Sequence, residues 1–325
     1  MRLDKPSWIG KILAEDAASQ ELTAFLKTKP EVQHFSLGDG LKVTGKSWVF
    51  KAEINGEDVV IKRFFEDDVS RVVLNLKDEL DFLERSFGDS RYQANRCLYV
   101  WPQDGIAVLS FAPGNRLGDQ IASASGDDRR QLIKQSGEWL RRYCSFRQRD
   151  SRFGPAFWVK KVLSVKTDRI SSPQDRFLLD RLLTSIRSQV DGVKGVPVVQ
   201  AATHGDFVGI NAHYHQGTIY GVDIQGESWL AVAKDVARFL VWLQIHNPVS
   251  AGGHRYGISL EYIDAFLESG VLNANEQTTT LPFLIAEQLY GRFVEGYARE
   301  DLRDTTRAAI EMYLDKAPGG DVQSC

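Results

Sequence analysis

One hairpin within the stretch 203–225 constrains the fold of this chain more than any other feature. Two short runs of β-forming residues, 212–215 and 218–222, are joined by a Gln-Gly pair, which is typical of a two-residue hairpin loop. A hairpin brings its two ends together, so Asn211 and Asp223, which flank the two strands, should face each other across its base. Amide and carboxylate oxygens suit Mg²⁺, so the sequence predicts a magnesium site there.

A third acidic group precedes this hairpin. The strand-like run 196–199 leads into a tight turn that holds His204, Gly205 and Asp206, and Asp206 stands five positions before Asn211. An Asp, an Asn five residues later, a hairpin and a second Asp form the pattern of a kinase catalytic loop. With its His-Gly-Asp turn, the stretch resembles the aminoglycoside phosphotransferase and choline kinase group of small-molecule kinases.

The resemblance covers most of the chain, about residues 43–297, and implies a fold. We expect an α+β, bilobal, protein-kinase-like architecture, with a small antiparallel sheet and one helix in the N-lobe and a larger, mostly helical C-lobe. The expected divisions are a helical cap over 1–32, the N-lobe over 33–111, the C-lobe with the catalytic loop and acceptor site over 112–317, and a tail over 318–325.

Two positions depart from the pattern of protein kinases. Val208 stands where those enzymes carry a Lys two residues after the catalytic Asp. Ile224 and Gln225 follow the metal-binding Asp in place of Phe-Gly. Both departures argue against an ordinary protein kinase and leave a kinase that acts on a small molecule.

The N-terminal part of the chain turns to strands after residue 33. Runs of β-forming residues occupy 41–43, 48–54 and 59–64, and an Asn-Gly pair between the last two predicts a hairpin. The turn between the first two runs lies where a kinase-like loop would cover the ATP phosphates. There Gly45 would let backbone N–H groups approach an anion, and Ser47 would add a hydroxyl.

The same turn contains a string that matches a different nucleotide-binding motif. Gly40 to Ser47 fit the Walker A pattern Gly-x-x-x-x-Gly-Lys-Ser. A true P-loop needs a helix after its glycines, because the helix N-terminus supplies part of the anion field. The residues 48–56 that follow predict a strand and a turn, so a hairpin loop is expected here.

A lysine on the third strand is the expected phosphate contact. Lys62 alternates with apolar residues and resembles the strand lysine that contacts the α- and β-phosphates, although a solvated strand lysine would show the same pattern. Apolar spacing predicts a helix over 70–87, which should carry the Glu that pairs with Lys62. Glu79 is the first candidate and Glu84 the alternative.

Another predicted hairpin leads out of the N-lobe. Its strands occupy 97–101 and 106–111 and are followed by Ala-Pro-Gly. This end resembles the hinge between kinase lobes, where backbone groups at Ser110 and Ala112 would contact the adenine edge. Side chains matter little for such contacts, so the string alone identifies the hinge only weakly.

Apolar periodicity predicts helices at both ends of the chain. Two short helices are expected within 7–28, the first with Ser7 as its N-cap. The longer helices that should build the C-lobe are expected over 127–147, 172–186, 234–243, 259–268, 281–297 and 301–314.

The resemblance also implies a role for each residue that matches the family's catalytic-loop motif. Asp206 would orient or deprotonate the acceptor hydroxyl, and Asn211 and Asp223 would hold Mg²⁺ beside ATP. Asp235 resembles the acid that anchors the loop, although an Asp in a first helical turn is also favoured by the helix dipole. We expect His204 to be structural. The acceptor, and GTP in place of ATP, remain open.

Two other classes of function compete with a kinase. His204, Asp206, His213, His215 and Asp223 could form the metal site of a hydrolase, since His213 and His215 lie on one face of a strand. Zn²⁺ in the purified protein would favour that class. A catalytically silent, kinase-like binding module is the third class, and the complete set of kinase-type residues counts against it.

Composition limits the partners of the chain. A formal charge of −3 over 325 residues gives no reason to expect nucleic acid. The three cysteines, Cys97, Cys144 and Cys325, lack metal-type spacing and indicate reduced thiols in a cytoplasmic compartment. No run approaches the roughly 20 apolar residues that span a bilayer.

One region is strongly basic. Between residues 129 and 169, twelve Lys and Arg residues face three acidic residues. Solvated helix faces explain such a run most simply. The alternative is a surface for an anionic acceptor or for peripheral membrane contact, which would argue against a cationic aminoglycoside.

Overall fold

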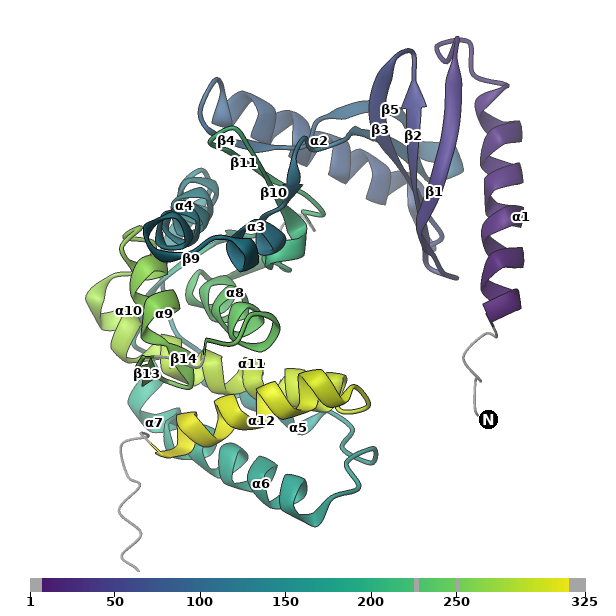
Figure 1. Ribbon diagram of the computed structural model, residues 1–325. Helices are drawn as coiled ribbons and strands as arrows, with labels where there is room; N and C mark the ends of the chain where they lie inside the picture. The colour runs from purple at the N-terminus through teal and green to yellow at the C-terminus, as the bar shows by residue number, and fades with distance from the viewer. Residues whose placement is uncertain (1–7, 225–227, 250–251, 316–325) are drawn as a thin grey trace, which may run out of the picture. The chain divides into compact units, whose positions relative to one another are not determined.

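The computed structural model describes residues 8–224, 228–249 and 252–315 (Figure 1). The chain divides into two compact units, Met1–Pro113 and Gly114–Cys325. The first unit is built on an antiparallel sheet and the second is mostly helical, so the predicted α+β class is confirmed.

A five-stranded antiparallel sheet forms the body of the first unit. Its strands, in spatial order, are β1 (Phe35–Val43), β2 (Ser47–Ile54), β3 (Glu57–Phe64), β6 (Ile106–Ser110) and β5 (Cys97–Trp101). The loop between β2 and β3 is the predicted two-residue hairpin. Asn55 and Gly56 have φ values of 53° and 85°, the left-handed conformations that match the twist of the flanking strands.

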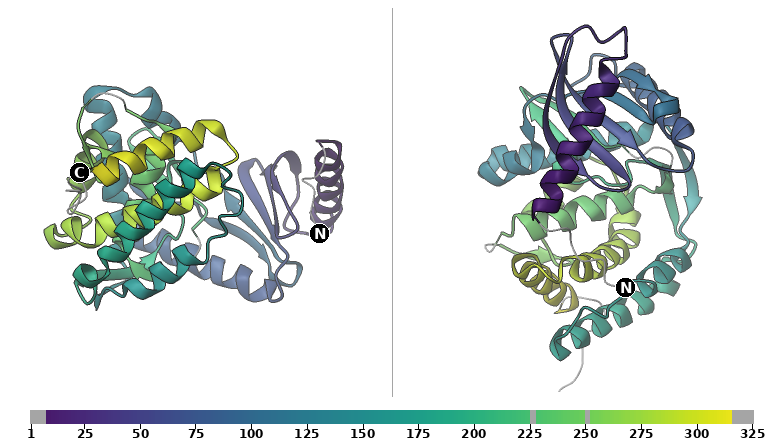
Figure 2. Two further views of the ribbon diagram at one scale, coloured as in Figure 1. Left: turned by 90° about the horizontal axis from the view of Figure 1, so that it is seen from below. Right: turned by 90° about the vertical axis from the view of Figure 1, so that its right-hand side faces the viewer.

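One continuous helix, α1 (Trp8–Leu26), covers this sheet where two short helices were expected (Figure 2). The seven residues 14–20 between the two apolar patterns contain neither Gly nor Pro, so nothing interrupts the helix. Ala18 and Leu22 are fully buried in the cluster that includes Phe50 of β2. The expected N-cap at Ser7 lies outside the described residues.

Helix α2 (Val69–Phe87) completes the first unit, with the short strand β4 (Tyr92–Ala94) and the 3₁₀ turn η1 (Pro102–Asp104). Asp68 caps α2 by accepting a hydrogen bond from Arg71 N at 3.2 Å. Its buried face includes Val73, Leu80 and Leu83, as the apolar spacing predicts.

Small antiparallel sheets frame the start of the second unit. Strand β9 (Pro197–Thr203) lies between β12 (Ser228–Ala231) and β8 (Gln148–Arg152). Strand β10 (Ala212–His215) pairs with β11 (Thr218–Gly221) and β7 (Asn115–Arg116). A two-stranded ladder joins β13 (His254–Arg255) to β14 (Ile258–Ser259). Of these strands, only β9, β10 and β11 correspond to runs predicted from the sequence; β7, β8, β12, β13 and β14 were not predicted.

The remaining chain of the second unit is largely helical. Its helices are α3 (Leu117–Ser123), α4 (Gly126–Ser145), α5 (Pro155–Leu163), α6 (Pro173–Ser188), α7 (Val190–Val193), the 3₁₀ turn η2 (Gly209–Asn211), α8 (Ala233–His246), α9 (Leu260–Leu267), α10 (Ala274–Thr278), α11 (Thr280–Gly296) and α12 (Glu300–Asp315). Among the described helices, none is both long enough and apolar enough to span a bilayer.

Helix α8 is the core of the second unit. Twelve of its fourteen residues are buried, as expected for a helix that is apolar on all sides and packed on all sides. The two exceptions are Arg238 and His246. His246 ends the helix, whereas Arg238 interrupts the buried run in its middle. A half-exposed arginine at that point indicates a purpose other than packing.

Candidate active site

The catalytic-loop hairpin forms as predicted. Strands β10 and β11 pair from Ala212↔Gly221 to His215↔Thr218, and the loop residues Gln216 and Gly217 both have positive φ values, 46° and 86°. This geometry fixes the register of the hairpin and therefore which residues meet at its base.

The groups expected to bind metal lie together at that base. Val222 N donates to the carbonyl of Asn211 at 2.9 Å, and Asp223 is the next residue. The Asn211 side chain donates through Nδ2 to the carbonyl of Asp206 at 2.9 Å, which leaves its amide oxygen as the group to bind a cation. Asp223 is exposed and has a left-handed φ of 58°.

His204 is buried beneath the loop and is not part of a reactive surface. Its ring lies 5.9 Å from that of Trp139 and 5.6 Å from that of Phe207. Burial lowers the pKa of His204, although Asp235 opposes this shift, so the ring is neutral at neutral pH. A neutral ring with its proton on Nε2 can donate to Val222 O at 3.1 Å and accept from Asp206 N at 3.4 Å.

Two buried charges on α8 support the turn before Asp206. Asp235 Oδ2 accepts a hydrogen bond from Gly205 N at 3.3 Å, and Oδ1 lies 2.9 Å from Lys234 Nζ. Lys234 Nζ also donates to the carbonyl of Gly205. Gly205 has a φ of 86°, a conformation that glycine adopts without strain. Sequence reasoning found Asp235 but not Lys234.

Arg238 is a second site residue that sequence reasoning missed. It lies three residues after Asp235 on α8, and its Nε and Nη2 contact Asp206 Oδ1 at 2.6 and 2.5 Å. Val208, which occupies the position of the protein-kinase lysine, is buried and offers no charge. The signal that could have found Arg238 is a cation in an otherwise apolar helix, in helical register with Asp235.

A small cavity of about 70 Å³ adjoins Arg238 and is bordered by α5, α8 and α11. Its walls carry the charged residues Lys161, Glu287 and Arg292. Lys161 belongs to the basic region 129–169, whereas Glu287 and Arg292 were not expected from the sequence. Because Arg238 contacts Asp206, this cavity, which lies wholly within the second unit, is the candidate place for a substrate group.

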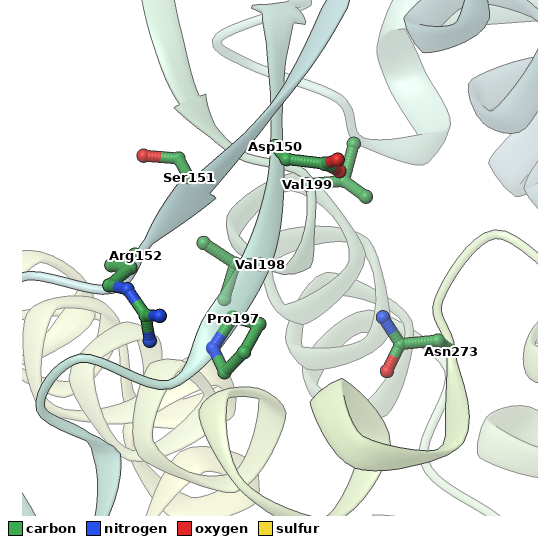
Figure 3. Close-up of a pocket in the computed structure, with 7 residues that line it drawn as sticks. All are labelled: Asp150, Ser151, Arg152, Pro197, Val198, Val199 and Asn273. Carbon is green, nitrogen blue, oxygen red and sulfur yellow. The ribbon is translucent and has the colours of Figure 1, made fainter.

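A larger depression, whose lining residues are drawn in Figure 3, lies beside Pro197–Val199, at the start of β9, whereas the catalytic turn follows the end of that strand. It has a volume of about 470 Å³, and Asp150, Arg152, Val198 and Asn273 are among its lining residues. It contains none of the predicted site residues, so its size alone does not connect it with the catalytic loop.

The predicted nucleotide-binding residues of the first unit lie on its sheet and on α2. Lys62 is half-buried on β3, opposite Ala107 of β6. Glu79 is buried on α2 with 6 % exposure. The alternative acid, Glu84, has a half-exposed side chain 4.0 Å from Arg96. Burial of a carboxylate requires a partner, which favours Glu79 over Glu84 as the acid of the pair.

The turn between β1 and β2 is a hairpin loop and not a P-loop. Strand β2 begins at Ser47, where a Walker A motif would begin a helix. Thr44 Oγ1 accepts from the backbone N–H groups of Lys46 and Ser47 at 3.3 and 3.2 Å. A side chain added at Gly45 would meet open space, so this glycine leaves the loop accessible.

At the hinge, one backbone donor is already used within the sheet. Ser110 N donates to the carbonyl of Arg96 at 2.8 Å, and Ser110 Oγ accepts from Arg96 N at 2.8 Å. A contact between Ser110 and a nucleotide would therefore use its carbonyl oxygen. Ala112 is buried and would offer its N–H.

The competing metal site does not form among the described residues. Within 8–224, 228–249 and 252–315, no group of three or more His, Cys, Asp or Glu side chains could hold a metal ion. His213 and His215 lie opposite Tyr220 and Thr218 on the hairpin. The hydrolase alternative thus gains no support from the geometry.

No protein-family model matches the sequence, and no curated protein resembles it in sequence. Solved structures do resemble it. Aminoglycoside phosphotransferase APH(4)-Ia is 11 % identical, with a TM-score of 0.62 over 93 % of this chain and 100 % of that one. A choline/ethanolamine kinase family protein from Mesorhizobium loti (15 %, TM-score 0.59) and the amicoumacin kinase hAmiN (15 %, 0.55) each match 93 % of this chain and 96 % of their own. At such identities the likeness concerns the fold: the chain has the kinase-like fold of the aminoglycoside phosphotransferases and choline kinase family proteins, as its catalytic-loop motif implied.

Proposed function

We propose that this protein is an ATP- and Mg²⁺-dependent small-molecule kinase that transfers the γ-phosphoryl group to a hydroxyl. One observation carries the proposal: Asp206, Asn211 and Asp223 lie together at the hairpin base, with the Asp206 carboxylate held by Arg238. In the reaction, the acceptor oxygen bonds to the γ-phosphorus and the bond to the β–γ bridging oxygen breaks. The hydroxyl proton passes to Asp206, and ADP leaves.

The contacts of Asp206 support its proposed role as the proton acceptor. Both contacts from Arg238 go to Oδ1, so Oδ2 can face the acceptor hydroxyl. The Asp206 side chain is 27 % exposed, which keeps it within reach of a bound substrate. Arg238 acts through Asp206 and is therefore a positioning residue, which holds the carboxylate in a single orientation.

Asn211 and Asp223 fit a magnesium ion. Both supply oxygen atoms, the donors that this hard cation prefers, and a site with two protein ligands leaves room for phosphate oxygens and water. The ion would neutralise charge on the β- and γ-phosphates. The Asn211 amide nitrogen is fixed to the loop backbone, so its oxygen is directed without loss of further side-chain entropy.

The nucleotide contacts are proposed from the first unit. Lys62, with Glu79 as its carboxylate partner, would contact the α- and β-phosphates. Ser47, beside the accessible Gly45, would cover the triphosphate. The carbonyl of Ser110 and the N–H of Ala112 would bind the adenine edge.

The ligands of the structural neighbours support the class of reaction. The hAmiN structure is a complex with AMP-PNP, Ca²⁺ and Ami, and an APH(4)-Ia variant is a complex with ADP and hygromycin B. Another neighbour, APH(2″)-IIIa, binds GDP and kanamycin, so GTP is to be compared with ATP as the donor. Each of these complexes holds a nucleotide together with a second small molecule.

The test combines binding with transfer. AMP-PNP should raise the unfolding temperature of the wild type in a Mg²⁺-dependent way, because a ligand that binds the folded state stabilises it. Asp206→Asn should keep this stabilisation and lose transfer by roughly 10²–10⁴-fold, the usual contribution of a catalytic base. Unchanged turnover in Asp206→Asn would overturn the assignment. Absence of any nucleotide effect, with Zn²⁺ found by elemental analysis, would instead favour a hydrolase.

A further inference from the structure

The walls of the charged cavity beside Arg238 are not predominantly acidic, whereas a site for a cationic aminoglycoside would need acidic walls. Three cations contribute to its walls: Lys161 of α5, Arg238 of α8 and Arg292 of α11. Two carboxylates, Glu287 and Glu295, are also present. The cavity favours an anion if both carboxylates are already neutralised by the protein or exposed to solvent. We therefore consider the contacts of Glu287 and Glu295 in turn.

Glu287 is fully engaged by the protein. Its side chain is 4 % exposed, Oε1 lies 2.8 Å from Lys161 Nζ, and Oε2 accepts from Gln288 Nε2 at 2.5 Å. Both oxygens of this carboxylate therefore have partners. The positive charge of Lys161 also offsets the charge of Glu287, so this buried carboxylate adds little net negative charge to the cavity.

Glu295 compensates Arg292 only weakly. The two side chains approach at 3.2 Å, but Glu295 is 69 % exposed, and ion pairs with such an exposed member contribute little. Arg292 itself is 27 % exposed. Burial, followed by the charge of Arg238, lowers the pKa of Arg292, and the charges of Glu295, Asp206 and Glu287 oppose this shift only in part.

Arg238 shares its charge between Asp206 and the cavity. Its Nε and Nη2 contact Asp206, so Nη1 is not needed for that pair. A second anion beside Arg238 and Arg292 would relieve the repulsion between the two guanidinium groups. An anion bound there would be separated from Asp206 by the Arg238 side chain, which contacts Asp206 directly.

Most of the other cations of the basic region are used within the protein. Arg130 pairs with Glu268, Arg141 donates to the carbonyl of Ser269 at 2.8 Å, and Arg152 donates to the carbonyl of Gly195 at 2.9 Å. These contacts explain much of the positive run as structure. Lys161 differs because it lines the cavity, so anion recognition is to be sought there.

We propose that the cavity between α5, α8 and α11 binds a carboxylate or phosphate group of the acceptor, through Arg292 and Arg238, and so presents a neighbouring hydroxyl to Asp206. This proposal rests on the kinase function proposed above and names its substrate class: a small hydroxyl compound with an anionic group. A volume of about 70 Å³ accommodates one such group and not a whole aminoglycoside ring system. A polycationic acceptor would meet two guanidinium groups there.

The first experiment measures anion binding directly. Inorganic phosphate and acetate are titrated by calorimetry, at constant ionic strength, into the full-length protein with AMP-PNP and Mg²⁺ present. The proteins are the wild type, Arg292→Gln, Arg292→Lys and, as a matched control, Arg187→Gln, which removes an exposed arginine of α6. Affinity should fall roughly tenfold or more in Arg292→Gln, because a charge-assisted hydrogen bond is lost. Arg292→Lys and the control should retain most or all of it.

The second experiment measures acceptor-dependent ADP release with glycerol, glycerate, glycerol 3-phosphate and kanamycin. Turnover should favour glycerate or glycerol 3-phosphate over glycerol, and which of the two is preferred identifies a carboxylate or a phosphate subsite. Arg292→Gln should raise KM for the anionic acceptor and leave KM for ATP unchanged.

Three results would overturn the anionic subsite: equal anion affinity in all four proteins, no anion binding by the wild type, or kanamycin turnover that Arg292→Gln leaves intact. Failure of the proposed kinase function is a separate observation, since AMP-PNP and Mg²⁺ would then not stabilise the wild type. Thermal unfolding of each variant shows that it is folded.

Discussion

The guanidinium of Arg238 contacts a single oxygen of the Asp206 carboxylate, Oδ1, through both Nε and Nη2. Protein kinases place a lysine two residues after the equivalent Asp, and this chain has a buried valine at that position. A cation from α8, 32 residues further along the chain, contacts the carboxylate instead. Residues of α8 therefore contact both Gly205 and Asp206 of the predicted catalytic loop.

Arg238→Gln should lower kcat by about 10–100-fold and leave KM for ATP unchanged, because a misplaced Asp206 loses orientation while the nucleotide site is intact. Arg238→Lys should restore part of the rate, since it returns the charge without the planar fork. In the Asp206→Asn background, and at saturating acceptor, Arg238→Gln should add little further loss of kcat. Equal, additive losses in both backgrounds would contradict a role through Asp206.

Asn211→Ala and Asp223→Ala should each abolish the Mg²⁺-dependent part of the stabilisation by AMP-PNP, since each removes a proposed oxygen ligand. The comparison is a thermal shift with AMP-PNP, with and without Mg²⁺. Asp191→Ala is the control because it removes an exposed carboxylate from α7. A full Mg²⁺ effect in either hairpin variant would place the ion elsewhere.

Mild acid should destabilise the second unit through His204. Burial lowers the pKa of this residue in the folded state, so the unfolded state, with a pKa near 6.5, takes up the proton first. The stability that depends on a neutral His204 is complete above about pH 6.5 and is lost as the pH falls below it, by up to about 2 kcal/mol at pH 5.

Urea unfolding at pH 7, 6 and 5 measures this effect. The slope of stability against pH should be smaller in His204→Gln than in the wild type. The exposed His215 provides the matched control, and His215→Gln should keep the wild-type slope. Identical slopes for all three proteins would show that His204 is not the titrating group.

Asp175 should be the strongest single ionic contribution to the packing of α6 on α12. Arg307 Nε and Nη2 lie 2.9 and 3.1 Å from its two oxygens, and Tyr297 donates to it at 2.9 Å. Burial alone would raise the pKa of Asp175, but the hydrogen bonds from Arg307 and Tyr297 outweigh burial and lower it. Asp175→Asn should therefore reduce the free energy of unfolding by about 1–3 kcal/mol.

The pH dependence has a definite sign. A lowered carboxyl pKa stabilises the protein fully above the unfolded value near 3.8 and ceases to do so as the pH falls through the folded value. The difference between wild type and Asp175→Asn should accordingly shrink below pH 4. Asp304, whose half-exposed side chain also contacts Arg307 at 2.9 Å, is the control. Asp304→Asn should cost under about 0.5 kcal/mol.

Glu79→Gln should weaken nucleotide use, and Glu84→Gln should not. If Glu79 holds Lys62, its neutral replacement lowers kcat/KM for ATP by about tenfold or more, since charge-assisted bonds are the strong ones. Glu84 is exposed and lies beside Arg96, so it is a matched control on the same helix. The reverse order of effects would exchange the two assignments.

The sequence predicted the hairpins correctly because their signals are local. Asn55-Gly56 and Gln216-Gly217 each determine a two-residue loop, and such a loop fixes the pairing of both flanking strands. The hydrogen bond between Val222 N and the carbonyl of Asn211 follows from that pairing. The prediction of two N-terminal helices was wrong because large apolar residues occur only near the two ends of α1, and the stretch between them is also helical.

Other features depend on contacts between distant parts of the chain. Strand β8 is rich in charged residues and has no apolar alternation, so only its pairing with β9 reveals it. Arg238 looked like one cation in an apolar helix until the fold brought it to Asp206. Lys234 is a similar case, since its target is the carbonyl of Gly205 in another segment.

The ladder between β10 and β11 determines where insertions in this stretch are tolerated. Because each rung joins one residue of β10 to one of β11, adding a residue to both strands would lengthen the arm and keep Asn211 and Asp223 opposed. Adding one residue to a single strand would shift every rung beyond it and separate the two groups. Related chains should therefore vary in the length of this arm in matched pairs of residues.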